Sequence, residues 1–348
     1  MKKKIAVLLA ISLLFVLVMT GCGGNSENVP PVATNTPVTE PSIEPELTPT
    51  AEPELEVHYP SFLLTNMDVA IGGAEWVTLS GEEALCIYLD YTNFSDRIIQ
   101  PSKELTVEAE QNGEGLTRPR GDTQEQRALI ENQNRRLFPG AVNRAAVYFT
   151  SVDAAAEIVL TFEDRTEGVT EELWLDPANL WDLIEPPVNP PAMELASIQG
   201  FSGSKAHFES DFSTQSEGEL ELLRHEFVEV GGERFVVVYF GIEVTGNMKE
   251  DDKKDPNLMT NCFVFQDGVQ LGSSSKQDDR MSGVNVYEIY ELFPEVAAHM
   301  QDIGLNEPVT TAIIYRLRSD SDVSVVAAFN CSDFTKGEAF IGDTFPVE

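Results

Sequence analysis

The sequence is poor in basic residues, and this shortage excludes several kinds of partner. Lysine and arginine together number 23 against 58 aspartates and glutamates, which gives a formal net charge of −35. A chain this acidic has no electrostatic basis for binding nucleic acid or anionic lipid headgroups. We therefore expect no nucleic-acid partner, and we expect the acidity to serve mainly solubility.

Cysteine is also scarce, with only four residues in 348. Four cysteines are too few for a disulfide scaffold in a chain of this length. Cys86 lies in an apolar run and is predicted to be a buried thiol. Cys262 and Cys331 could pair in an oxidising environment, and the sequence alone leaves that pairing open.

Histidine is equally rare, and the spacing of the four histidines argues against a metal site. No two of them stand four residues apart, and no HExxH motif occurs, so we expect no metal site and no cofactor. Asp251, Asp252 and Asp255 could offer oxygen ligands to calcium, but three lysines partly neutralise the run and EF-hand spacing is absent. We predict a solvated loop there. The four histidines are His58, His207, His225 and His299.

Two short motifs with a catalytic or adhesive precedent also occur. Ser273 and Lys276 fit S-x-x-K, but the K-T-G element that accompanies it in penicillin-recognising enzymes is missing. Arg120, Gly121 and Asp122 spell RGD in a polar connection, and this triplet is common by chance. We expect neither motif to be functional, and we predict that the protein is not an enzyme.

The first residues predict a bacterial lipoprotein signal that ends at Cys22. Three lysines precede an apolar run from Ile5 to Met19, and the small residues Thr20 and Gly21 then lead to the cysteine. This pattern resembles a lipobox, in which the cysteine becomes the new N-terminus and carries acyl chains. Residues 1–21 are thus predicted to be the signal peptide. We expect the membrane to be a partner through a lipid anchor at Cys22, with the rest of the chain on the extracellular side.

Residues 22–59 are predicted to be a disordered linker. They are rich in proline, threonine and glutamate, and they contain no lysine or arginine. Such a segment cannot bury enough apolar surface to fold, and it favours extended conformations. At ~3.1 Å per residue it could span roughly 100 Å, which suits a thick Gram-positive wall.

From residue 60 onward the pattern changes to short β-type runs. Typical strands are predicted at 62–71, 74–79, 84–93, 105–111, 143–150 and 156–162, and another is predicted near 169–175. Residues 123–137 are predicted to be a loop or a short surface helix. The proline-rich segment 184–194 predicts a stiff joint, because prolines of this density do not fit inside a sheet.

The second half of the chain repeats the first. Gly81-Glu82 and the strand after it match Gly232-Glu233 and its strand at an offset of 151 residues, and Gln111-Asn112-Gly113 matches Gln266-Asp267-Gly268 at an offset of 155. We predict two copies of one β-sandwich, over residues 60–183 and 195–348. The second copy carries a short helical insertion at 286–301, where Pro294 should interrupt the helix.

The first copy also resembles a known type of domain. Tyr91, Asn93 and Ser95 form a Y-x-N-x-S strand end, followed by the Gln111-Asn112-Gly113 turn and by Pro139-Gly140 before Tyr148. These elements are similar to the immunoglobulin-like domains of unknown function on lipoproteins of Firmicutes. The resemblance implies an all-β chain of two tandem Ig-like antiparallel sandwiches. It supplies no catalytic residues, and the second copy lacks the Asn-x-Ser and Pro-Gly elements.

These observations together predict a membrane-anchored, extracytoplasmic lipoprotein that acts as a non-catalytic binding, adhesion or envelope-associated module. A surface protein or a glycan is the expected ligand. Two alternatives remain at this stage: a solute-binding lipoprotein of a transporter, which requires βαβ units, and a secreted hydrolase with a spatially assembled site.

Overall fold

A computed structural model of the protein describes residues 60–189, 194–209, 217–246, 260–272, 291–295, 303–329 and 338–347. All of them belong to one compact unit, Val57–Glu348. The predicted signal peptide with Cys22, and the predicted linker, lie outside the described residues. None of the described helices is long and apolar enough to cross a membrane.

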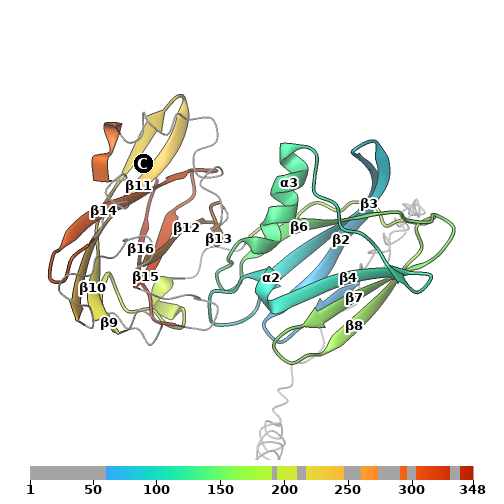
Figure 1. Ribbon diagram of the computed structural model, residues 1–348, viewed down its shortest axis with the longest axis horizontal. Helices are drawn as coiled ribbons and strands as arrows, with labels where there is room; N and C mark the ends of the chain where they lie inside the picture. Colours follow the sequence, from blue (N-terminus) through green and yellow to red (C-terminus); the bar gives the residue numbers. More distant parts are fainter. Residues whose placement is uncertain are drawn as a thin grey trace, which may run out of the picture. The chain divides into compact units, whose positions relative to one another are not determined.

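The fold is all-β, as predicted, and its first half is a sandwich of two antiparallel sheets (Figure 1). One sheet has the order β1-β2-β3-β6 and the other has the order β5-β4-β7-β8. Successive side chains of a strand face opposite sides, so alternate residues of both sheets point into one shared apolar core. Leu89 of the first sheet and Phe162 of the second are examples. The strands are β1 (Ser61–Leu63), β2 (Met67–Leu79), β3 (Glu82–Asn93), β4 (Leu105–Gln111), β5 (Glu114–Gly115), β6 (Val142–Thr150), β7 (Ile158–Asp164) and β8 (Thr170–Leu175).

The second half has the same plan. Its sheets have the orders β14-β11-β10-β9 and β13-β12-β15-β16, which match those of the first half strand for strand. None of the described sheets contains the parallel βαβ units that a solute-binding lipoprotein would require. The strands are β9 (Lys205–Glu209), β10 (Glu217–Val230), β11 (Glu233–Gly246), β12 (Thr260–Gln266), β13 (Val269–Gln270), β14 (Val309–Arg316), β15 (Val323–Phe329) and β16 (Ile341–Phe345).

The repeated Gln-Asn/Asp-Gly motif has the same structural role in both halves. The Gln111 side chain donates to the carbonyls of Asp153 and Ala156 and accepts from the Asp153 amide. The Gln266 side chain likewise donates to two loop carbonyls, those of Ser319 and Ser321. Gln111 therefore fixes the loop between β6 and β7, and Gln266 fixes the matching loop between β14 and β15. This shared role explains why the motif recurs.

Asn112 and Gly113 form the turn between β4 and β5, with φ values of 54° and 80°. Asp267 and Gly268 form the matching turn between β12 and β13, with φ values of 52° and 74°. Two successive residues with positive φ make the tight hairpin turn that Asn-Gly and Asp-Gly favour.

Helices are few among the described residues. They comprise α2 (Pro101–Glu104), α3 (Gln124–Glu131) and the 3-10 turns η1 (Asn132–Asn134) and η2 (Leu195–Ser197). A capping box between Thr123 and Gln126 starts α3, which lies next to β6 (Figure 1). The predicted insertion is described only at residues 291–295, where residues 291–292 and 294–295 are helical and Phe293, next to Pro294, is not.

One core cluster joins the two sandwiches. It contains the core of the first sandwich together with side chains from the second, among them Phe263, Phe265, Val326 and Ala328. These four side chains come from the outer face of the sheet formed by β12 and β15, whereas alternate residues of the same strands, such as Val264 and Val325, fill the second core. The outer face of the β12–β15 sheet in the second sandwich thus packs against the first sandwich.

The segment that receives this sheet face lies just before β6. Phe138 and Phe265 stack with ring centroids 4.1 Å apart, and both rings are buried. The Arg136 guanidinium lies 3.9 Å from the Phe263 ring centroid, and Arg135 Nη1 donates to the Gln270 carbonyl at 2.9 Å. Backbone bonds add to this junction, because the Phe138 amide donates to the Gly268 carbonyl. The halves therefore share a specific, buried interface.

Candidate functional site

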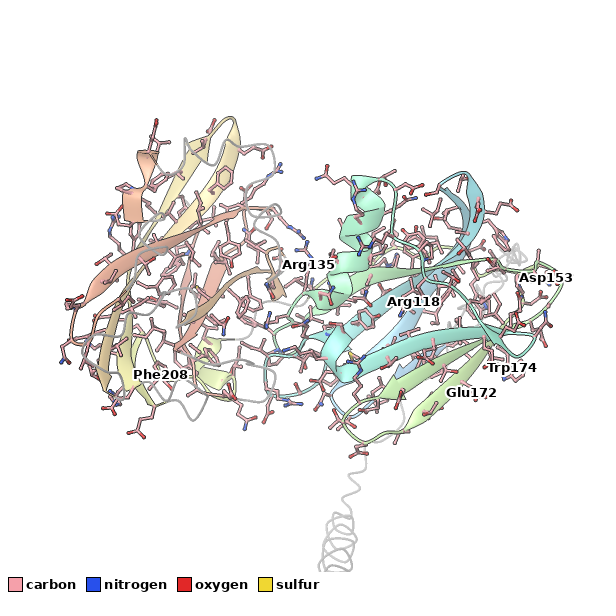
Figure 2. The ribbon with its side chains drawn as sticks, in the orientation of Figure 1. Arg118, Arg135, Asp153, Glu172, Trp174 and Phe208 are labelled. Carbon is pink, nitrogen blue, oxygen red and sulfur yellow. The ribbon has the colours of Figure 1, made fainter. Side chains whose placement is uncertain are left out.

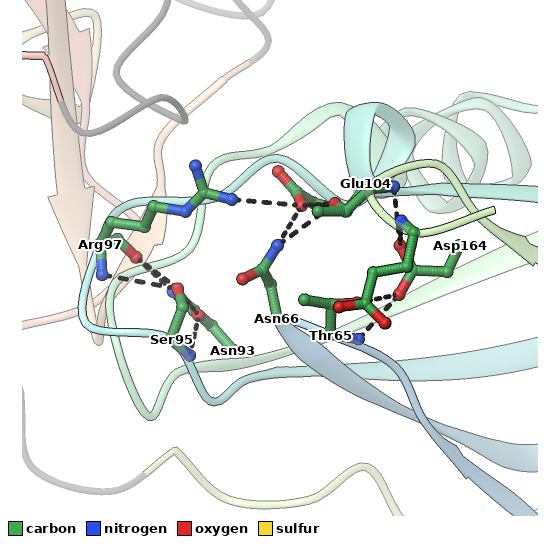
Figure 3. A network of polar contacts seen from close by, with 9 residues as sticks. Thr65, Asn66, Asn93, Ser95, Arg97, Glu104 and Asp164 are labelled. Atoms are coloured by element: carbon green, nitrogen blue, oxygen red, sulfur yellow. Dashed lines mark hydrogen bonds and ion pairs between the residues drawn. The ribbon is translucent and has the colours of Figure 1, made fainter. Parts of the chain in front are cut away.

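A network of polar side chains fixes the end of the first sandwich (Figure 3). Glu104, buried at the end of α2, accepts from Asn66 Nδ2 at 2.7 Å and from Thr166 Oγ1 at 3.2 Å, and it lies 3.5 Å from an Arg97 nitrogen. The three partners come from three different loops. Glu104 therefore ties the β1–β2, β3–α2 and β7–β8 connections together.

Asp164 makes a second set of contacts in the same network. Its carboxylate accepts from the Thr65 amide at 2.7 Å and the Thr65 hydroxyl at 2.6 Å, and from the Thr166 and Glu167 amides. Burial raises the pKa of this carboxyl, but the hydrogen bonds outweigh that effect and hold the pKa below its ordinary value. The ionised form is therefore the one that this end of the sandwich stabilises.

Replacing Asp164 with asparagine is expected to lower stability in a pH-dependent way. Because the folded-state pKa of Asp164 is depressed, its contribution is complete above the unfolded-state pKa of about 3.9 and is lost as the pH falls through the lower folded-state value. Urea unfolding of the wild type and D164N between pH 7 and pH 2 should give a stability difference that shrinks below about pH 4. A difference that stays constant over this range would contradict the assignment.

In the Y-x-N-x-S motif at the end of β3, the Asn93 side chain bonds to backbone groups of nearby segments. Asn93 Oδ1 accepts from the amide and hydroxyl of Ser95, while its Nδ2 donates to the carbonyls of Arg97 and Leu137. The motif thus shapes the loop after β3 and links it to the segment before β6. The Tyr91 side chain takes no part in these contacts and lines a cleft instead.

This cleft lies on the open edge of β4. It has a volume of about 140 Å³ and is lined by Tyr91, Ser102, Thr106, Arg118, Gln133 and Arg165, among others. Because β5 pairs only with the last two residues of β4, the edge near Val107 has no partner strand, and Arg118 Nη1 donates to the Val107 carbonyl instead. Sequence reasoning did not identify this site, because its residues come from five separate segments.

A second exposed feature is Trp174, whose side chain lies on the outer face of β8 beside Glu172 (Figure 2). It is 59% exposed, although its strand neighbours Leu173 and Leu175 point inward. The cross-strand registers align Trp174 with Val159 and Glu110, and align Glu172 with Thr161 and Glu108. The outer face of this sheet therefore presents an exposed tryptophan ring surrounded by carboxylates.

Two residues of the RGD triplet, Gly121 and Asp122, make hydrogen bonds within the protein. The Asp122 carboxylate accepts hydrogen bonds from the amide and hydroxyl of Ser80, and these bonds lower its pKa. The Gly121 carbonyl accepts from Arg127 Nη1. Because its carboxylate is engaged in this way, Asp122 serves to connect the β2–β3 turn to the start of α3.

The remaining candidates give no assembled site among the described residues. His207 pairs with Glu219 through Nδ1 at 3.0 Å, and the His225 ring stacks on Phe345 at 3.7 Å. No group of three or more His, Cys, Asp or Glu side chains in the described part of the chain could hold a metal ion. The remaining predicted residues lie outside the described ones: Cys22, His58, Asp251, Asp252, Asp255, Ser273, Lys276, His299 and Cys331.

Cys86 is buried in β3, as predicted. Burial raises the pKa of its thiol to about 11, so the thiol stays protonated near neutral pH. A protonated and inaccessible thiol is a packing group, since the thiolate is the reactive form.

Comparison with known proteins gives structural neighbours of low sequence identity. No family model matches the chain, and no curated protein matches it. A solved structure of a putative lipoprotein from Staphylococcus aureus is similar at 10% identity, covering 41% of this chain and 93% of that one, with a TM-score of 0.27. The exo-chitosanase CsxA of Amycolatopsis orientalis is similar at 11% identity and a TM-score of 0.19, covering 79% of this chain but only 26% of the enzyme.

Proposed function

We propose that the protein is a lipid-anchored surface protein whose two sandwiches form a non-catalytic binding module. The lipobox ending at Cys22 and the acidic, proline-rich segment after it support an anchor and a tether. In this proposal the linker holds the folded head away from the membrane, facing the cell exterior.

We also propose that each half is immunoglobulin-like. In an Ig domain, strands A, B and E share one sheet, while C, F and G share the other, and C′ can be added next to C. The order β2-β3-β6 corresponds to A-B-E, and the order β5-β4-β7-β8 corresponds to C′-C-F-G. This correspondence supports the resemblance found at Asn93 and Ser95, with β1 as an extra edge strand.

The observation that carries the binding proposal is a contrast between equivalent sheet faces. At the 155-residue offset, Glu108 and Glu110 of β4 occupy the positions of Phe263 and Phe265 of β12. The phenylalanines are buried in the junction, whereas the glutamates are exposed beside Trp174. The same face of the repeat thus makes an internal interface in one copy and stays open in the other.

The chemistry of the open face indicates the class of partner. An exposed indole offers a large apolar and cation-binding surface, and carboxylates beside it favour positive charge. We therefore expect a partner with amine or guanidinium groups, either a basic protein segment or an amino-bearing glycan. Binding should weaken as salt rises, because these charges are exposed to solvent.

The test is sedimentation of the chain from residue 22 to 348, produced without its acyl chains as C22A, with cell envelopes of its source organism. W174A should weaken binding at least about tenfold, because a tryptophan that becomes buried on binding supplies much of the binding energy in many interfaces. F94A is the matched control, because Phe94 is 62% exposed and follows β3 of the other sheet, away from the face that carries Trp174. Equal binding by W174A and the wild type would refute this face as the binding surface.

A further inference from the structure

The cleft beside β4 combines two guanidinium groups in a protein that is otherwise strongly acidic. Arg118 and Arg165 both line it, and none of its lining residues is an aspartate or glutamate. Glu108 is near enough to Arg118 to offset part of its charge. The local charge of the cleft is thus opposite to that of the whole chain.

Each arginine is held by one contact that leaves most of its donors unused. Arg118 Nη1 donates to the Val107 carbonyl at 2.9 Å, and Arg165 Nε donates to the Thr106 hydroxyl at 2.8 Å. A guanidinium has five N–H donors, and neither side chain has a second hydrogen-bond acceptor among the described residues. Both groups are therefore positioned while keeping the capacity to bind an acceptor.

Tyr91 adds a third polar group to the cleft. Its side chain is only 2% exposed and lines the cleft, and no described residue hydrogen-bonds its hydroxyl. The hydroxyl is not among the buried side-chain oxygens that lack a partner in the described part of the chain, so it is open to the cleft. It is therefore positioned to bond to a polar group there.

We propose that this cleft is a binding site for an oxyanion group, such as a carboxylate or a phosphate. The two guanidiniums would donate to its oxygens, with the Tyr91 and Ser102 hydroxyls and the Gln133 amide as further donors. Pockets for drug-sized ligands have volumes of about 300–1,000 Å³, so a cleft of about 140 Å³ holds one small group and not a whole drug-sized molecule. The ligand is a small anion or the charged end of a longer chain.

This site does not include Trp174 and differs from the Trp174 face in charge, although Glu108 lies near both. The Trp174 face offers carboxylates to a cationic partner, whereas the cleft offers guanidiniums to an anion. Either proposal can therefore fail without the other, and loss of one binding activity in a variant should leave the other intact.

The test is an NMR titration of the C22A chain from residue 22 to 348 with sodium acetate and, separately, sodium phosphate, at constant ionic strength set with sodium chloride. Saturable shifts are expected for the backbone amides of Ser102 and Thr106. R118Q should weaken binding at least about tenfold, and Y91F, which keeps the ring, should weaken it about three- to tenfold. R120Q is the matched control, because Arg120 is close in sequence but does not line the cleft.

The two anions distinguish possible sources of the ligand. Saturation by acetate supports a carboxylate-bearing ligand, and saturation by phosphate alone supports a phosphoryl ligand. Shifts that do not saturate with either anion, or that are the same in Y91F, R118Q and R120Q, would overturn the proposal. Because Y91F changes a single hydroxyl, its thermal unfolding curve should stay close to that of the wild type, so that a loss of binding is not a loss of fold.

Discussion

Replacing Phe138 with alanine is expected to destabilise the protein by about 3–5 kcal/mol, the usual cost of removing a buried phenylalanine side chain. Phe138 is buried at the junction, where its ring stacks on Phe265 with centroids 4.1 Å apart. The cavity would open between the two sandwiches, so their unfolding should also become less coupled. Calorimetry should then resolve two transitions where the wild type gives one.

F94A is the control for this prediction, because Phe94 is an exposed aromatic residue whose neighbour Asn93 bonds to the same segment before β6 that contains Phe138. It should change stability by no more than about 0.5 kcal/mol. A single transition in F138A with a loss below about 1 kcal/mol would mean that the junction does not join the halves.

The second large effect is expected for Arg144→Ala, which breaks a buried ion pair. Arg144 Nε and Nη2 each lie 2.7 Å from a different oxygen of Asp90, and the two residues face each other across β3 and β6. Arg144 Nη1 also donates to the Ile184 carbonyl at 2.6 Å and so fixes the start of the proline-rich joint. Removing the arginine leaves a buried carboxylate without its partner, which costs about 3–5 kcal/mol.

Urea unfolding at pH 7 measures this loss, and the chain provides a matched exposed pair. Arg316 and Glu233 are 2.6 Å apart but lie at the surface, so R316A should cost at most about 1 kcal/mol. Similar losses in R144A and R316A would contradict the structural role assigned to the buried pair. R144K should not restore stability, because lysine cannot form two parallel bonds to one carboxylate.

The sequence predicted the strands and the repeat well, because both depend on local patterns. Alternation of apolar residues located the strands, and the offsets of 151 and 155 residues aligned strands that occupy equivalent places in the two halves. The Asn112-Gly113 turn was also predicted from its dipeptide, since these residues tolerate positive φ. One difference is that two predicted strands, 62–71 and 74–79, are mostly one strand, β2, which continues through a bulge between Ile71 and Gly73.

The glycine at that bulge has a physical reason. Gly73 has a φ of 125°, and a Cβ atom there would lie 2.7 Å from the Leu183 backbone. The Ala74 amide donates to the Trp181 carbonyl, so the chain leaving the first sandwich runs beside β2. A contact between residues about 110 positions apart leaves no trace in local periodicity.

The candidate sites were harder to predict for the same reason. Tyr91, Thr106, Arg118 and Arg165 meet only because two sheets fold together, and no spacing between them signals a cleft. Trp174 did leave a signal that was missed. It stands between the inward-facing Leu173 and Leu175, so alternation alone places it on the exposed face.

The central claim, a lipid-anchored surface protein, is tested most directly by mass spectrometry of the mature N-terminus. The protein should be purified from the envelope of its source organism and digested, and the N-terminal peptide should then be identified. The account predicts a peptide that begins at Cys22, lacks residues 1–21 and carries the added mass of acyl chains. An unmodified peptide that retains Met1, or one that begins elsewhere without lipid, would contradict the anchor and the cell-surface role that depends on it.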